Sequence, residues 1–395
     1  MSLVYIGSSN PEEVTERLLR MGSSVNFASK TLQNALLEGL YAHYPDLKII
    51  SSWGITPFPK VRKIFFNREE LSYGGKKGNY IYVGAVNLPI LNLLSRFMRI
   101  RGELKRQLSK TEDNSVIIYE VHTPYLLAVA TLRKRIKKTC LIVPDLPEFM
   151  SGNNGRLHRF LKRIDKWIIN KCLAKIDSYA LLSEPMQERL PMKDKQWTLM
   201  EGIFQPLVNE EKVNKESLRT IMYTGGVYHR RGVDLLLDAF ELIDKSNYRL
   251  WIRGNGDMVP EIKERAKKDP RIIYFDPMSR EELLKMERRA TIMINPTPPS
   301  LDFTRYFFPS KTMEYLASGT PTIMYRLGCM PKEYDEHVYY VDDEHVETLR
   351  NKLVEICEKP QEELDAFGEA ARNFILSKKT PFTQCGKIIE LLNKL

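Results

Sequence analysis

The sequence has few features of a secreted, membrane-spanning or metal-clustered protein. Its five cysteines are odd in number and widely scattered, and no two of them form a C-x-x-C pair. Neither a disulfide framework nor a cysteine zinc site is therefore predicted, and we expect the thiols to be buried or incidental. No apolar run approaches the ~18 residues that a membrane-spanning helix requires. Residues 1–10 contain neither a basic stretch nor a long apolar one, which argues against a secretory signal and predicts a cytoplasmic protein.

The composition indicates an ordinary globular protein with an uneven distribution of charge. The chain has 395 residues, of which 43% are hydrophobic and 28% charged, and this length predicts two to three domains. Its net charge is +10, but residues 1–205 hold 31 basic and 19 acidic side chains, whereas residues 206–395 hold 29 and 31. The basic excess lies entirely in the first half, so we expect one domain only to meet an anionic surface.

Short β-rich runs alternate with helical patterns along the chain. In the first half, the expected strands are 3–7, 48–51, 80–83, 116–121, 139–143 and 179–183, and the expected helices include 27–42 and 123–138. In the second half, the expected strands are 220–223, 248–253, 272–275, 291–295 and 322–325, and the expected helices are 232–243, 260–268, 280–289, 311–318 and 346–358. This alternation predicts parallel α/β units.

The pattern restarts after about residue 205, which predicts two doubly wound domains. We expect an amino-terminal domain over residues 1–205 and a carboxy-terminal domain over residues 206–381, joined near a polar linker. The last apolar helix, 382–395, could belong to either domain and could complete the first. In such a protein a ligand is expected at the carboxyl ends of the strands, in the cleft between the domains.

A glycine turn follows the first strand of the second half. The segment Tyr223–Gly232 reads Tyr-Thr-Gly-Gly-Val-Tyr-His-Arg-Arg-Gly, so two arginines lie between the glycines and the next helix. Glycines let backbone N–H groups approach an anion, a helix N-terminus adds partial positive charge, and arginine can bind phosphate through two hydrogen bonds. We therefore consider Gly225, Gly226, Arg230 and Arg231 as phosphate ligands. An ordinary glycine turn with a solvated arginine pair is the alternative.

A second polar cluster begins a later helix. Lys311 and Glu314 are three residues apart and share one helix face, with Lys311 in the first turn. A cation is poorly placed at a helix start unless it is exposed or has an anionic partner. Glu314, one turn further on, could accept hydrogen bonds from sugar hydroxyls. The alternative is an ordinary surface ion pair.

Together these segments resemble the nucleotide-sugar half of the family-4 glycosyltransferases, which have the two-Rossmann GT-B architecture. The resemblance runs along much of residues 218–330. The glycine turn is similar to the family's strand, glycine turn and basic residue, and Trp251–Gly256 is similar to its apolar strand followed by G-x-G. Lys311–Pro321 resembles the family's signature K-x-x-E-x-x-A-x-G-x-P. The implied fold class is α/β of the GT-B type, with two Rossmann-like domains facing a cleft.

The resemblance implies a role for each of these residues. Arg231 and Lys311 would neutralise the donor diphosphate and stabilise it as the leaving group, because negative charge grows there as the sugar departs. Glu314 would match the glutamate that holds the ribose. Gly226 lies where many members have an arginine, so Arg230 could take over that contact. Gly254, Ser310 and Thr312 complete the donor-binding set.

Two positions depart from the family pattern. Tyr306 occupies the place of the first glutamate of E-x7-E, so Asp302, Arg305 or main-chain N–H groups near 308–310 could contact the donor sugar instead. Pro144 lies where many members have a histidine close to the reacting sugar.

In the first half, two strand-end side chains are candidates for the catalytic site. His122 follows the predicted strand 116–121 and is similar to the family's cleft-facing histidine, and Asp145 is the polar group nearest to the replaced histidine. A structural capping role is the alternative for both.

The resemblance implies a retaining glycosyltransferase that uses a UDP-, GDP- or dTDP-sugar, with donor binding in the second half and acceptor binding in the first. The acceptor would be a lipid-linked or cell-surface glycan precursor. No Asp-x-Asp tripeptide occurs, and we expect no metal and no tightly bound cofactor. A GT-B nucleotide-sugar epimerase and a non-catalytic nucleotide-sugar-binding protein are the alternatives, and the residue replacements noted above keep both open.

The basic excess is concentrated in residues 86–175, which contain 18 basic and 7 acidic side chains. Two segments, 87–110 and 156–175, combine apolar residues at helical spacing with many Lys and Arg. Such helices suit the surface of an anionic bilayer. We expect the apolar stripes to face the domain core and the basic surface to lie against the inner face of the membrane. A nucleic-acid partner is not predicted, because no binding motif accompanies the charge.

Overall fold

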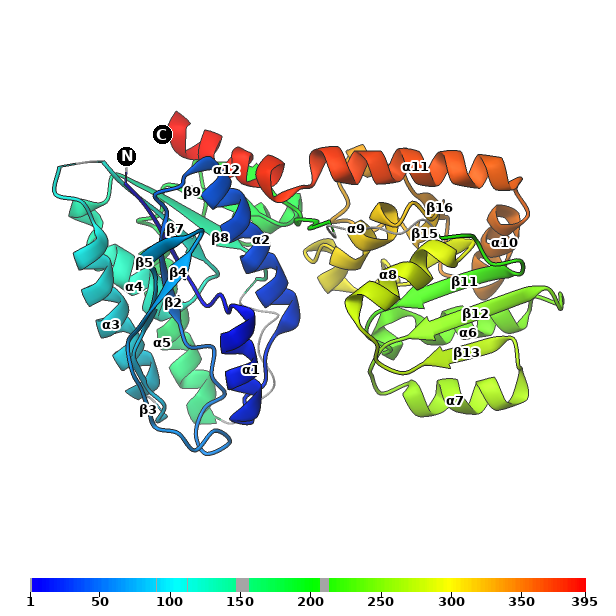
Figure 1. Cartoon of the computed structure of the whole chain (residues 1–395), viewed down its shortest axis with the longest axis horizontal. Helices are drawn as coiled ribbons and strands as arrows, with labels where there is room; N and C mark the ends of the chain where they lie inside the picture. Colours follow the sequence, from blue (N-terminus) through cyan, green and yellow to red (C-terminus); the bar gives the residue numbers. More distant parts are fainter. Residues whose placement is uncertain (1, 90, 112, 147–155, 207–212) are drawn as a thin grey trace. The chain divides into compact units, whose positions relative to one another are not determined.

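The computed structural model describes residues 2–89, 91–111, 113–146, 156–206 and 213–395, with side chains omitted for 156–160. The chain divides into two compact units (Figure 1). Unit 1 comprises Met1–Ile203 together with Pro381–Leu395, and unit 2 comprises Phe204–Thr380. The fold is α/β with two parallel-sheet units, as the sequence predicts.

Unit 1 contains an eight-stranded sheet in the order β10-β9-β8-β7-β1-β2-β5-β4, in which the β4–β5 pair is antiparallel and the other pairs are parallel. The strands are β1 Ser2–Gly7, β2 Lys48–Ser52, β4 Glu69–Tyr73, β5 Lys76–Val83, β7 Asn114–Tyr119, β8 Lys138–Val143, β9 Ser178–Leu181 and β10 Gln196–Leu199. Strands β3 Phe65–Phe66 and β6 Ala85–Val86 form a small separate pair. Every residue of β1 and β7 is buried, as expected for parallel strands that are covered on both faces.

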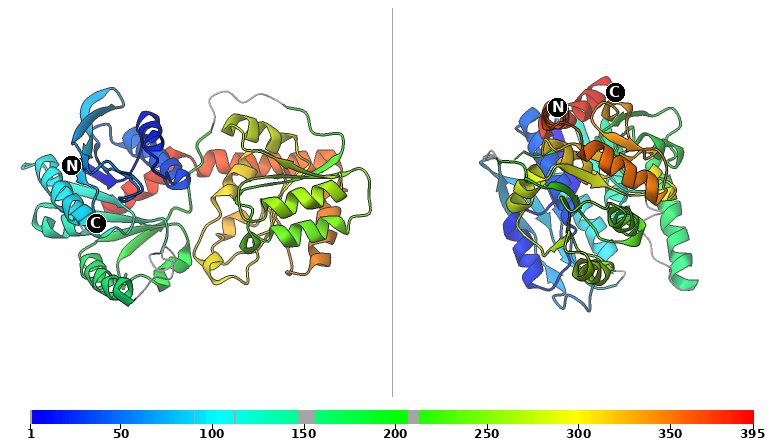
Figure 2. Two further views of the ribbon diagram at one scale, coloured as in Figure 1. Left: turned by 90° about the horizontal axis from the view of Figure 1, so that it is seen from below. Right: turned by 90° about the vertical axis from the view of Figure 1, so that its right-hand side faces the viewer.

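Two layers of helices cover the sheet of unit 1. The helices are α1 Glu12–Arg20, α2 Phe27–His43, α3 Leu91–Gln107, α4 Thr123–Thr131, α5 Arg156–Leu173 and α12 Pro381–Lys394. Helix α12 lies against α2, as Figure 2 shows, and it also contacts β8, β9 and β10. Helices α3, α4 and α5 pack side by side, and right-handed crossovers place them on the opposite face.

Unit 2 contains a six-stranded parallel sheet in the order β13-β12-β11-β14-β15-β16. The strands are β11 Arg219–Thr224, β12 Tyr248–Arg253, β13 Ile272–Phe275, β14 Ile292–Asn295, β15 Thr322–Tyr325 and β16 Tyr339–Val341. The helices are α6 Val233–Glu241, α7 Val259–Lys268, α8 Arg280–Arg289, α9 Ser310–Ala317, α10 Val346–Cys357 and α11 Gln361–Lys378. Alternate strand residues enter two apolar cores: Ile221 and Ile292 belong to the larger one, and Met222 and Met293 to the smaller one beside α8.

The structure corrects two expectations about the first half. The helix expected over 123–138 ends at Thr131, and a short 3-10 turn, Arg133–Arg135, leads to β8, which begins at Lys138. The other correction concerns the apolar stripes of the basic helices, which do not wholly face the core. Leu104 and Cys172 are buried, but the stripe residues nearer the start of each helix are exposed: Leu91, Leu94 and Met98 on α3, and Leu161, Ile164 and Trp167 on α5. The stripe side chains at 157 and 160 lie outside the described residues.

Candidate functional site

The glycine turn after β11 packs against the turn after β12. A Cβ atom on Gly254 would lie 1.6 Å from the Gly225 carbonyl oxygen, and Gly254 has a φ of +156°. The Gly225 amide donates to the Arg253 carbonyl at 3.0 Å, and the Val227 amide donates to the Asn255 carbonyl at 3.0 Å. Gly254 is therefore required by contact between two loops, which holds the ends of β11 and β12 together.

A second glycine places the start of α6. Gly232 has a φ of +70°, and a Cβ there would lie 2.0 Å from the Pro296 carbonyl oxygen, just after β14. His229–Arg231 form a short 3-10 turn immediately before this glycine. The two predicted arginines are thus held at the carboxyl edge of the sheet, between the ends of β11 and β14.

The side chain of Arg231 is a partly buried cation without a carboxylate partner among the described residues. Its guanidinium lies 5.5 Å from the ring centre of Phe303 and 5.0 Å from that of Phe307. Burial lowers the pKa of Arg231 from its ordinary value, which shows that the surroundings disfavour the charge. Arg230, by contrast, is exposed and lies 5.4 Å from the Tyr228 ring centre. An anion between the turn and α9 would offset the cost of burying Arg231.

The signature segment forms α9 and lies beside the glycine turn. The Tyr315 hydroxyl donates to the Thr224 carbonyl at the end of β11, and Arg231 contacts Phe307 three residues before the helix. Among the described residues no side chain caps the start of α9, where Ser310 is exposed. The structure therefore brings the two predicted clusters together at one edge of the sheet.

The predicted α9 residues differ in their surroundings. Lys311 and Glu314 form an ion pair within the helix, and both side chains remain partly exposed. Thr312 is fully buried and accepts a hydrogen bond from Asn295 Nδ2 at 3.4 Å, so its hydroxyl serves the packing of the helix. Tyr306 is 3% exposed, whereas Asp302 is exposed near the surface.

A buried carboxylate under this edge was not among the predicted site residues. Glu287 of α8 is 0% exposed, and its Oε1 atom accepts a hydrogen bond from Thr224 Oγ1 at 2.9 Å. Its Oε2 atom has no hydrogen-bond partner among the described residues. Burial and the charge of Glu314 raise the pKa of Glu287 to about 7. The sequence signal available was an acidic residue at a helix position between apolar neighbours.

In unit 1, the predicted His122 and Asp145 lie at the carboxyl ends of the adjacent strands β7 and β8. The His122 Nδ1 atom is buried without a partner among the described residues, and burial lowers the pKa of His122 to about 3. The ring lies 4.5 Å from that of Tyr125. Burial raises the pKa of Asp145. Both residues are therefore held partly away from water at one edge of the sheet.

Glu120 and Arg96 also belong to this group, and neither was among the predicted site residues. Glu120 has a φ of +69°, which is costly for a residue with a Cβ and is typical of functional sites. Burial and the neighbouring Asp145 raise the pKa of Glu120 to about 7. Arg96 of α3 donates to the Trp53 carbonyl at 2.6 Å, while its buried Nε atom has no partner in the described part of the chain.

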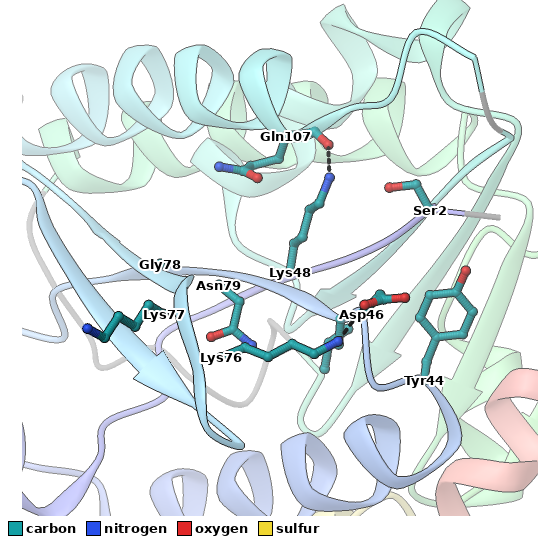
Figure 3. A pocket seen from close by; sticks show the side chains of 10 residues that line it. Ser2, Tyr44, Asp46, Lys48, Lys76, Lys77, Gly78, Asn79 and Gln107 are labelled. Carbon is teal, nitrogen blue, oxygen red and sulfur yellow. Dashed lines mark hydrogen bonds and ion pairs between the residues drawn. The ribbon is translucent and has the colours of Figure 1, made fainter.

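A hollow of about 490 Å³ lies at the opposite, amino-terminal edge of the unit 1 sheet (Figure 3). Two of its lysines already have partners. Lys48 donates to the Gln107 carbonyl at 2.9 Å, and Lys76 pairs with Asp46 at 2.5 Å. The two lysines at the strand starts are thus already neutralised or hydrogen-bonded within the unit.

Neither a metal centre nor a membrane span is found in the part of the chain that the structure describes. No group of three or more His, Cys, Asp or Glu side chains there could hold a metal ion. None of the described helices is both long and apolar enough to span a bilayer. The five cysteines are buried and free, as expected.

Comparison with solved structures defines the class of fold. The chain is similar over 100% of its length to 99% of sucrose-phosphate synthase from Thermosynechococcus elongatus, with 12% identity and a TM-score of 0.67. It is likewise similar over 100% of both chains to a variant of TarM from S. aureus in complex with fondaparinux, alpha-GlcNAc-glycerol and UDP (9% identity, TM-score 0.63). The lipopolysaccharide outer core galactosyltransferase WaaB matches over 100% of both chains with 12% identity and a TM-score of 0.62. These likenesses establish the GT-B fold.

A sequence match lies within unit 2. Residues 218–359 match the family model described as glycosyl transferases group 1. No curated protein matches the chain in sequence. The predicted class of enzyme is confirmed: this chain carries a glycosyl transferases group 1 domain on a GT-B fold.

Proposed function

We propose that the protein is a retaining glycosyltransferase that moves a sugar from a nucleotide-diphosphate donor to a hydroxyl acceptor. The observation that carries the proposal is the guanidinium of Arg231, which is partly buried beside two phenylalanine rings with no carboxylate partner among the described residues. A diphosphate would supply the missing negative charge. The uncapped start of α9 and the ammonium group of Lys311 add further donors close by.

These cations would act on the leaving group. As the bond between the sugar and the diphosphate breaks, negative charge grows on the phosphate oxygens, and preorganised cations stabilise that charge more than they stabilise the bound donor. Lys311 must leave Glu314 or share its contact to do this. Glu314 then accepts hydrogen bonds from the ribose. Tyr306 is buried, so Asp302 and Arg305, which are both exposed, and main-chain N–H groups near 308–310 are the candidates for contact with the donor sugar.

The acceptor hydroxyl would bind at the carboxyl edge of unit 1. Glu120, His122 and Asp145 gather there, and two of these groups have pKa values shifted by burial to about 7 and about 3. A carboxylate with a pKa near neutrality can accept a proton from a hydroxyl or hold it by a hydrogen bond. The strained φ of Glu120 supports a functional rather than a packing role.

The acceptor is proposed to be a lipid-linked or cell-surface glycan precursor at the inner face of the membrane. Helix α3 exposes apolar side chains in its first half and α5 exposes them as far along as Trp167; Met98 and Trp167 are 62% and 63% exposed. Exposed basic residues lie close to these side chains: Arg99 follows Met98, and Lys166 precedes Trp167. Apolar side chains that would enter the bilayer, surrounded by Lys and Arg, suit an anionic membrane.

The edge at which α3 and α5 begin supports a lipid-borne acceptor. Helices that follow parallel strands begin at the carboxyl edge of the sheet, so the first turns of α3 and α5 lie at the same edge as Glu120 and Asp145. A membrane in contact with these helices would present its lipid headgroups near the proposed acceptor group. The protein would then be peripheral to the membrane.

The donor proposal is tested by thermal shift with UDP-, GDP- and dTDP-sugars and no added metal. Because the TarM complex contains UDP, UDP-sugars are the first to test. We expect at least one donor to stabilise the wild type and Arg231→Gln to weaken that binding by roughly 30-fold or more, the cost of about 2 kcal/mol for a lost charged hydrogen bond. Arg326→Gln is the matched control, because Arg326 pairs with Asp335 at 2.8 Å on the surface of the same unit. The absence of any shift in the wild type would refute the proposal.

An epimerase with the same fold remains the second candidate, favoured by the burial of Tyr306 where the family has a glutamate. The two activities differ in product. A transferase requires an added acceptor and yields a glycosylated one, whereas an epimerase yields isomerised free donor without any acceptor. Chromatography of both product pools from one reaction separates them.

A further inference from the structure

A buried carboxyl group, that of Glu287, lies beside the proposed donor site, and packing alone does not explain it. The Oε1 atom of Glu287 accepts a hydrogen bond from the Thr224 hydroxyl at 2.9 Å, but the Oε2 atom is buried without a partner among the described residues. The surrounding core is apolar, formed by residues such as Met222, Trp251 and Leu283. An ionised carboxylate there would be costly, so the protonated form is favoured.

Thr224 links this carboxyl group to the donor-binding helix. It contacts Glu287 of α8 through its hydroxyl, and its carbonyl accepts a hydrogen bond from the Tyr315 hydroxyl of α9. Tyr315 follows Glu314, the proposed ribose ligand, in the same helical turn. The end of β11 therefore joins the buried group to the helix that bears the proposed donor ligands.

The groups that act on the charge of Glu287 lie on α8, α9 and β11. On α9, the Glu314 carboxylate disfavours ionisation of Glu287, whereas the Lys311 ammonium favours it. On α8 itself, Arg280 favours ionisation, and on β11 the Thr224 hydroxyl does so by hydrogen bonding. Burial is the largest influence. Together with Glu314 it outweighs the groups that favour ionisation, so the pKa of Glu287 is raised to about 7.

We propose that Glu287 is a positioning residue that couples donor binding to the uptake of a proton. This inference rests on the proposed function of the donor site. When Glu287 is protonated, Lys311 and Glu314 face only each other and the ligand. When Glu287 loses its proton, the new negative charge repels Glu314, attracts Lys311 and opposes an anionic diphosphate.

The sign of the pH dependence follows by linkage. A bound diphosphate adds negative charge near Glu287, so its pKa rises further in the complex than in the free protein. Donor affinity is then highest when Glu287 is already protonated, at acidic pH, and falls as pH rises through the pKa of the free protein. The nucleotide sugar itself does not contribute, because a phosphate diester lacks the second ionisation that a monoester shows at about pH 6.

The test is calorimetric titration with the nucleotide sugar that binds best in the thermal-shift panel. Between about pH 6 and pH 8.5 the wild-type Kd should rise about fivefold or more, and binding at about pH 7.5 should take up protons from the buffer. In Glu287→Gln both effects should vanish while binding persists. Glu281→Gln is the matched control, because Glu281 is exposed on the same helix and pairs with Lys285 at 3.2 Å.

Three results would overturn the inference. The first is a Glu287→Gln variant that keeps the wild-type slope and proton uptake. The second is loss of the slope in His229→Asn instead, because His229 pairs with Asp234 at 3.2 Å beside the glycine turn and its pKa is raised by that contact. The third is a wild type that binds no nucleotide sugar at any pH, which would refute the proposed function as well.

If Glu287→Gln does not fold, Glu287→Met takes its place, since an apolar side chain suits this core.

Discussion

Single side chains in this protein differ in whether their charge is matched by a partner. Arg230 and Arg231 are adjacent in the chain, yet one is exposed and the other is partly buried beside Phe303 and Phe307. Both arginines were predicted from the sequence as phosphate ligands, but the sequence could not distinguish them. The direction in which each side chain points depends on a 3-10 turn and on a loop some 70 residues away. Glu287 and Glu120 were missed for a similar reason: their burial is decided by elements distant in sequence.

Glu120 gives a prediction at this scale. Its pKa rises from 4.5 to about 7 on folding, so the wild type has its full stability below the unfolded value and loses it as pH rises through about 7. Gln cannot ionise, so Glu120→Gln should be more stable than the wild type at pH 8 by up to about 3 kcal/mol, and this advantage should shrink towards pH 4. Thermal unfolding at several pH values measures this difference in stability.

The same variant should transfer sugar more slowly. Wild-type activity in Glu120→Gln would remove Glu120 from the acceptor site.

Elements were predicted well where their pattern is strong. The five strands expected in unit 2 agree with the structure to within one or two residues, because parallel strands buried on both faces are continuous apolar runs, whereas the short edge strand β16 was missed. Helix α11 was missed. Its buried face includes Gly368 and Ala371, and a Cβ on Gly368 would lie 1.9 Å from the Gly319 carbonyl oxygen. Leu364 and Ile375, at helical spacing with these small residues, were the sequence signal available for this helix.

The contact between the turns after β11 and β12 gives a prediction for these elements. Gly254→Ala would place a Cβ 1.6 Å from the Gly225 oxygen, so the two turns must separate. We expect a loss of about 3 kcal/mol or more, together with weaker donor binding. Gly102→Ala is the control: no atom lies within 4 Å of its Cβ, and helix propensity should raise stability by about 0.5–1 kcal/mol. A Gly254→Ala protein with unchanged unfolding would contradict this packing.

At the scale of the whole molecule, the chain forms two units whose charge differs. The first half of the sequence has the basic excess, but the expectation that its apolar stripes face the core was wrong for part of α3 and part of α5. Helical periodicity shows that residues share a face; it does not show whether another layer covers that face. The final helix shows the same limit, since only the structure assigns α12 to unit 1.

Membrane binding tests this arrangement of surfaces. Replacing Leu94 and Trp167 by glutamate should lower binding to vesicles that contain anionic lipid by about tenfold or more, because apolar burial is lost and repulsion is added. Vesicle sedimentation measures the change. Leu242→Glu is the control, since Leu242 is 50% exposed in unit 2. Equal binding by the double variant and the wild type would show that α3 and α5 do not meet the membrane.

The most direct test of the account is transfer itself. The wild type is incubated with a labelled nucleotide sugar and a lipid extract, and the label is followed into the lipid fraction. We predict a labelled lipid product from the wild type and a loss of roughly 100-fold or more in rate for Arg231→Gln, because this change removes a cation that stabilises the leaving group. Arg326→Gln should retain the wild-type rate. Undiminished transfer by Arg231→Gln, or label recovered only as isomerised free donor, would contradict the account.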